Sequence, residues 1–145
     1  MSAPRSAVLA AAQRALAAEH AAIYAYGVAG AFLPGPGRAE ARAAQAGHLA
    51  RRDRLAAQVA DLAADPVAPA PVYDLPGPVT DPASAQALVT LVEERLAAMW
   101  ADVVALPEVA VREPAALALQ ESAVRAALWR GASVAFPGLP ERSAS

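Results

Sequence analysis

One carboxylate interrupts an apolar helix face near the start of the chain. In the stretch LAAEHAAIYAYG, residues 16–27, a helical period places Glu19 on the same side as Leu16, Ile23 and Tyr26. A carboxylate in an apolar core costs on the order of several kcal/mol unless it is paired, protonated or bound to a cation. The rest of the chain should therefore supply a partner for Glu19.

The later segments with a helical period also place polar side chains on apolar faces. Gln45 and His48 are one turn apart, Glu93 or its neighbour Glu94 follows in the third segment, and Glu121 lies in the fourth. The apolar positions in line with these groups are Leu55, Val59 and Leu62, then Val89, Leu96, Trp100 and Val103, then Leu117, Val124 and Leu128. Carboxylates and an imidazole that converge without thiols can hold a hard or borderline metal ion inside a helix bundle.

Proline and glycine divide the chain into four predicted helices at 6–29, 37–64, 81–106 and 113–130, followed by a tail at 131–145. Short connections join the first pair and the second pair, which predicts two antiparallel hairpins in one all-α domain spanning 1–145. Glu19 lies about as far before the first connection as His48 lies after it. The two side chains should therefore meet at a similar depth. Glu93 and Glu121 match less well in the second hairpin, so either residues 106–113 run along the axis or one of these two glutamates faces solvent.

A proline-rich crossover at 65–80 separates the two predicted hairpins. At ~3.1 Å per residue an extended chain of this length reaches on the order of 50 Å, whereas a helix of ~25 residues is only ~38 Å long. We expect an ordered crossing, with Val72, Tyr73 and Leu75 partly buried; a structureless tether is the alternative. Thr80 or Asp81 can cap the third helix.

Composition excludes several classes of function. The 145 residues include no cysteine, which removes disulfides, thiol nucleophiles and cysteine-ligated metal sites. The net charge of -2 and the pI of about 5.6 give no global attraction to nucleic acid or an anionic membrane. No apolar run is long enough for a membrane helix. We expect a cytoplasmic protein with neither nucleic acid nor membrane as a partner.

Several motifs resemble a known family. The stretches EHAAIYAYG, AQAGHLARRD, YDLP, EERLAAMW, RAALWRG and FPGLPE, within residues 7–141, are similar to the uncharacterised bacterial (actinobacterial) family called domain of unknown function 4439. The helix order, the long middle crossing and Glu19 also resemble the ferritin-like superfamily. The resemblance implies a ferritin-like four-helix bundle of two hairpins, and it assigns no function.

The superfamily resemblance also implies a ligand pattern, which this chain matches in part. The pattern has glutamate on the first and third helices and glutamate-x-x-histidine on the second and fourth. Glu19 and Glu93 (or Glu94) fit the single glutamates, but the second helix reads Gln45-Ala-Gly-His48 and the fourth reads Glu121-Ser-Ala-Val124. Three glutamates cannot balance the charge of two divalent ions, so we do not expect a di-metal centre.

Two states of this degenerate site remain open. One Fe, Mn or Zn ion can be held by Glu19, His48, Glu93 and Glu121. Alternatively, the cluster contains no metal, the carboxylates share protons or pair with Arg52, Arg95 or His48, and Gln45 donates a hydrogen bond. We favour the metal-free state.

The function that follows is that of a non-enzymatic scaffold or interaction protein. Its small alanine faces permit close helix association, which predicts a homodimer. The alternative function is a ferritin-like, metal-dependent oxidoreductase with a mononuclear or an altered di-metal Fe/Mn site. His20 points away from Glu19 and is expected to pair with solvent or with the crossover, and Trp100 and Trp129 are expected in the core or at a subunit interface.

Overall fold

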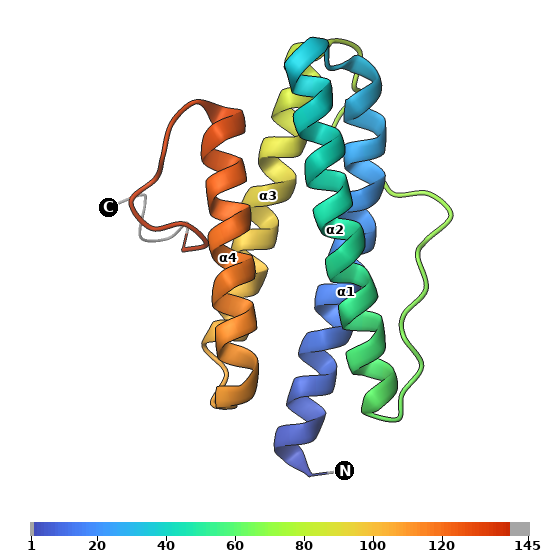
Figure 1. Cartoon of the computed structure of the whole chain (residues 1–145), viewed down its shortest axis with the longest axis vertical. Helices are drawn as coiled ribbons and strands as arrows, with labels where there is room; N and C mark the ends of the chain where they lie inside the picture. Colours follow the sequence, from blue (N-terminus) through green and yellow to red (C-terminus); the bar gives the residue numbers. More distant parts are fainter. Residues whose placement is uncertain (1, 140–145) are drawn as a thin grey trace. The chain divides into compact units, whose positions relative to one another are not determined.

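Four α-helices make up the regular structure of the protein, as a computed structural model that describes residues 2–139 shows (Figure 1). The helices are α1 (Ala3–Phe32), α2 (Gly35–Asp61), α3 (Pro82–Val104) and α4 (Val109–Arg130). No strand occurs in the described range. The all-α class is confirmed, and the four helices are consistent with a four-helix bundle. The observed ends differ from the predicted ones by a few residues.

The chain forms two compact units, residues 1–88 and 89–145, with the boundary inside α3. The first unit contains α1, α2, the crossing segment and the first residues of α3. The second contains the rest of α3, α4 and the segment that follows it. The expectation of one domain stays a prediction.

Small side chains let α1 and α2 approach each other closely in the first unit. Only Leu33 and Pro34 join the two helices, and they run side by side (Figure 1). Buried alanines of this hairpin are Ala11, Ala12, Ala15, Ala22, Ala25 and Ala29 on α1, with Ala41 and Ala44 on α2. Alanine loses no rotamer freedom in a helix and permits a short distance between helix axes.

The crossing segment is ordered and lies along α1. Gln13 binds it at two points, because its Nε2 donates to the carbonyl oxygen of Asp65 at 2.6 Å and its Oε1 accepts from the backbone N–H of Val67 at 2.8 Å. His20 Nε2 lies 3.1 Å from the carbonyl oxygen of Val67. The rings of Tyr24 and Tyr73 are 5.4 Å apart. The ordered crossing and the pairing of His20 with it are both confirmed.

One of the three side chains expected to anchor the crossing segment is misplaced. Tyr73 and Leu75 are half-buried, but Val72 is 68% exposed. Successive side chains of an extended chain point to opposite sides. Because Tyr73 faces Tyr24, its neighbour Val72 faces solvent.

Asp81, rather than Thr80, caps the start of α3. Its Oδ1 accepts from the backbone N–H of Ser84 at 2.7 Å, and the Ser84 hydroxyl oxygen accepts from the backbone N–H of Asp81 at 3.1 Å. The hydrogen bonds from the Ser84 backbone and then its side chain hold the pKa of Asp81 below the usual 3.8. The carboxylate therefore stabilises the helix start at pH values above 3.8, and this contribution is lost as the pH falls through the lowered pKa.

The α3–α4 hairpin of the second unit buries large side chains from α3 and mostly small ones from α4. The predicted core positions of α3 are confirmed, since Val89, Leu96, Trp100 and Val103 are all at most 5% exposed. The buried residues of α4 are Ala115, Ala118, Ser122, Ala126 and Trp129. No described helix is long and apolar enough to cross a membrane.

The predicted core face of α4 is wrong. Leu117, Val124 and Leu128 are 55%, 51% and 74% exposed, and Glu121 lies among them. A pattern search selects the face with the largest apolar side chains. In α4 the core face carries alanine and serine instead, because it packs closely against its neighbours.

Candidate functional site

A buried polar cluster joins α1 and α2 in the first unit. His48 Nδ1 donates to Glu19 Oε2 at 2.7 Å, and Arg51 Nη1 lies 3.4 Å from Glu19 Oε1. Glu19 and His48 have no exposed surface, and Arg51 is 6% exposed. The predicted meeting of Glu19 with His48 is confirmed.

Helical spacing on α2 places both partners of Glu19 on one face. His48 and Arg51 are three residues apart, so their side chains project from the same side of the helix. The His48 ring lies 5.2 Å from the Tyr26 ring at 33°. Tyr26 is 1% exposed, so its ring contributes an apolar wall to the cluster.

The charge of Glu19 is balanced by a residue that the sequence analysis did not select. Arg52 was expected to pair with the carboxylates, but its guanidinium lies 2.7 Å from Asp53 in an exposed pair. Arg95 is exposed. Arg51 follows His48 by three residues, which is about one helical turn, and this spacing was the signal that could have identified it.

The side chain of Gln45 on α2 forms a hydrogen bond to α1. Its Nε2 donates to the carbonyl oxygen of Ile23 at 3.0 Å, so the expected hydrogen bond from Gln45 is made to the α1 backbone. A Cβ atom on Gly27 would come within 3.3 Å of the same nitrogen. The absence of a side chain at Gly27 therefore gives the amide room to reach α1.

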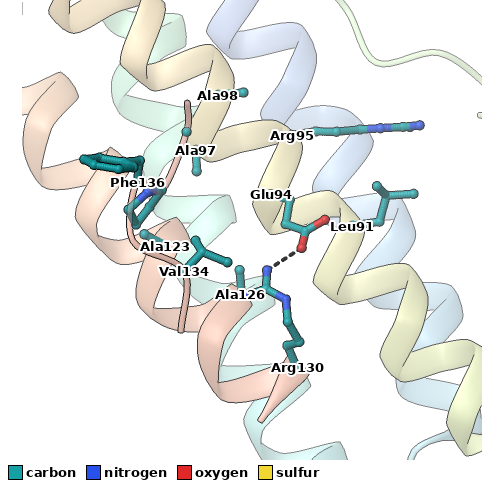
Figure 2. Close-up of a pocket in the computed structure, with 12 residues that line it drawn as sticks. Leu91, Glu94, Arg95, Ala97, Ala98, Ala123, Ala126, Arg130, Val134 and Phe136 are labelled. Atoms are coloured by element: carbon teal, nitrogen blue, oxygen red, sulfur yellow. Dashed lines mark hydrogen bonds and ion pairs between the residues drawn. The ribbon is translucent and has the colours of Figure 1, made fainter. Parts of the chain in front are cut away.

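In the second unit Glu93 faces the core and Glu94 does not. Glu93 has no exposed surface, and its Oε1 lies 3.9 Å from Arg125 Nη1. Glu94 is half-exposed and forms an ion pair with Arg130 (Figure 2). This settles which of the two adjacent glutamates is buried.

Glu121 lies on the exposed face of α4, so its predicted inward position is wrong, and the alternative that one glutamate of the second hairpin faces solvent is confirmed. Its side chain is 53% exposed, and its Oε2 is 3.9 Å from Arg125 Nη2. Arg125 is thus within ion-pair range of both Glu93 and Glu121. Within residues 2–139, no three His, Asp or Glu side chains form a group that could hold a metal ion.

An apolar groove of about 370 Å³ lies between α3, α4 and the segment after α4 in the second unit (Figure 2). Alanines of both helices form much of its surface, and Val134 and Phe136 form another part. Gly138 (φ 79°) brings this segment close to α3, where a Cβ atom would lie 2.6 Å from the carbonyl oxygen of Ala97. The charged residues that line the groove are Arg95 and the ion pair of Glu94 with Arg130.

The chain belongs to the family described as domain of unknown function (DUF4439), whose model matches residues 11–141. The resemblance inferred from the motifs is thereby confirmed. The fold is also similar to the crystal structure of a conserved hypothetical protein, rv2844, from Mycobacterium tuberculosis. The TM-score is 0.81 at 32% identity, over 90% of this chain and 98% of that chain. No curated protein matches.

Removing Glu19 should destabilise the protein strongly. Glu19→Ala removes a buried carboxylate from the guanidinium of Arg51 and the imidazole of His48, and breaking a buried ion pair typically costs about 3–5 kcal/mol of unfolding free energy. Glu94→Gln is the matched control, because it removes a carboxylate from an exposed ion pair and should cost at most about 1 kcal/mol. Urea denaturation measures both changes.

A double variant separates charge from packing. Glu19→Gln combined with Arg51→Met removes both charges and should recover part of the stability lost in Glu19→Gln alone. Equal losses for Glu19→Ala and Glu94→Gln, or no recovery in the double variant, would contradict the importance of the buried pair.

Proposed function

We propose that this chain is a non-enzymatic, ferritin-like helical scaffold that works through protein association, and that its buried polar cluster needs no metal. The observation that carries the proposal is the position of Arg51 beside Glu19. A carboxylate that would otherwise need a cation already has a guanidinium at 3.4 Å and an imidazole N–H at 2.7 Å.

Electrostatics argues against a divalent ion at Glu19 while Arg51 remains in place. The guanidinium of Arg51 offsets the negative charge of the Glu19 carboxylate, which weakens the attraction of this carboxylate for an added ion. At an effective dielectric constant of ~20, two unit positive charges ~4 Å apart repel by about 4 kcal/mol, and a divalent ion roughly doubles this. Gln45 adds no negative charge.

The second candidate is a metal-dependent oxidoreductase with one Fe, Mn or Zn ion held by Glu19, His48, Glu93 and Glu121. The complete burial of Glu19, His48 and Glu93 favours it, because buried carboxylates and imidazoles are typical of ligands in bundle cores. The exposure of Glu121 weighs against it.

Elemental analysis distinguishes the two candidates. Protein purified without chelators, then incubated with Fe(II), Mn(II) or Zn(II) and desalted, should retain essentially no metal. Retention near one equivalent that is lost in a Glu19→Ala, His48→Ala double variant and kept in Glu94→Gln would instead establish the metal-dependent alternative.

The surface proposed for association is the exposed face of α4, and its proposed occupant is a second copy of the chain. Leu117, Glu121, Val124 and Leu128 are separated by four, three and four residues, so the spacing reads identically in both directions. Around a two-fold axis, an antiparallel α4 of the second copy would place Leu128 opposite Leu117 and Val124 opposite Glu121. Arg125 of the same helix lies 3.9 Å from Glu121 and compensates its charge.

A charged residue introduced on the exposed face of α4 should prevent the proposed dimer from forming. The unmodified protein is expected to sediment as a dimer in analytical ultracentrifugation, and Leu128→Glu as a monomer, since a carboxylate would replace a leucine contact. Val72→Glu is the matched control, because Val72 is 68% exposed against 74% for Leu128, and should remain dimeric. A monomeric unmodified protein, or a dimeric Leu128→Glu variant, would overturn this surface assignment.

A further inference from the structure

A second hollow, of about 390 Å³, lies at the end of the first unit where α1 gives way to α2. Tyr26, Gly27 and Gly30 line it from α1, and Arg38, Arg42 and Gln45 line it from α2. Its size falls in the range of small-molecule sites. Neither the family nor the proposed scaffold function accounts for it.

Glycine helps to form the hollow. A Cβ atom built on Gly30 would meet no atom within 4 Å, so the space beside this residue is open. Glycine is among the poorest helix formers, and α1 otherwise contains many alanines, which are the best. The absence of a side chain at Gly30 therefore leaves part of the hollow open.

The hollow carries positive charge without a matching acid. No aspartate or glutamate is among its lining residues. Arg38 is held by a hydrogen bond from its Nε to the carbonyl oxygen of Leu33 at 3.0 Å, which leaves its two terminal nitrogens available to a ligand. Arg42 follows one turn later, and in the part of the chain that the structure describes it has neither an ion pair nor a hydrogen bond.

We propose that this hollow binds the oxyanion group of a small molecule, either a phosphate or a carboxylate. The planar guanidinium fork of Arg42 matches the paired oxygens of either group, and Arg38 supplies a second cation. The Gly27 and Gly30 surface lets the ligand approach the α1 backbone, and Gln45 contributes a polar wall. The volume leaves room for a body beyond the anionic group.

Isothermal titration calorimetry with the full chain tests the proposal, with pyrophosphate as the phosphate probe and succinate as the carboxylate probe. At least one of them should bind, and the comparison identifies the oxyanion. Arg42→Ala should weaken that binding about tenfold or more, because a charge-assisted hydrogen bond commonly contributes that factor. Gly30→Leu should weaken it as well, since the leucine fills the hollow without changing the charge.

Arg54→Ala is the matched control, because it removes the same charge from an exposed position of α2 that does not line the hollow. It should bind the probe as the unmodified protein does, and circular dichroism should show that all three variants are helical. No binding of either probe to the unmodified protein would overturn the site. Equal weakening by Arg54→Ala and Arg42→Ala would also overturn it, since that result indicates attraction by net charge alone.

Discussion

The burial of the Glu19 carboxylate constrains the first unit more than any other feature. A charge with no exposed surface is tolerated only with partners in place, and His48 and Arg51, which contact the Glu19 carboxylate, come from α2. A one-residue slip of α2 would rotate these side chains by about 100° around the helix and remove both contacts. The cluster therefore fixes the register of the hairpin, which the hydrogen bond of Gln45 to Ile23 reinforces.

Small residues make this register possible and the crossing segment completes it. Alanines on facing helix surfaces let α1 and α2 come close enough for side chains of ordinary length to meet around Glu19. On another side of α1, Gln13 and His20 bind the backbone of the crossing segment. Polar side chains of α1 thus connect it to both neighbours.

Much of this unit could be predicted because its signals are local. The positions of proline and glycine predicted where the helices lie. Glu19 and His48 are at similar distances from the connection between α1 and α2, which predicted that their side chains meet. The choice of Arg51 over Arg52 depended on a rotation of about 100°, which a run of adjacent arginines does not reveal. The choice of Glu93 over Glu94 depended on the same kind of rotation.

The error on α4 has a different physical origin. Its apolar stripe of large side chains is real but faces outward, because close packing inside selects alanine and serine. A hydrophobic pattern cannot distinguish a buried face from an exposed face when both are apolar. The predicted inward position of Glu121 depended on that stripe, and so it was wrong too.

The central claim is that His48 donates its Nδ1 proton to Glu19 inside a metal-free cluster. Long-range ¹H–¹⁵N correlation of the imidazoles tests it directly, because the chain has only two histidines and a His20→Gln variant assigns the spectrum. We expect a slowly exchanging Nδ1 proton on His48 whose signals do not move when Zn(II) or Mn(II) is added. An unprotonated Nδ1, or His48 signals that shift or broaden at one equivalent of metal while Glu19→Gln abolishes the effect, would contradict the account.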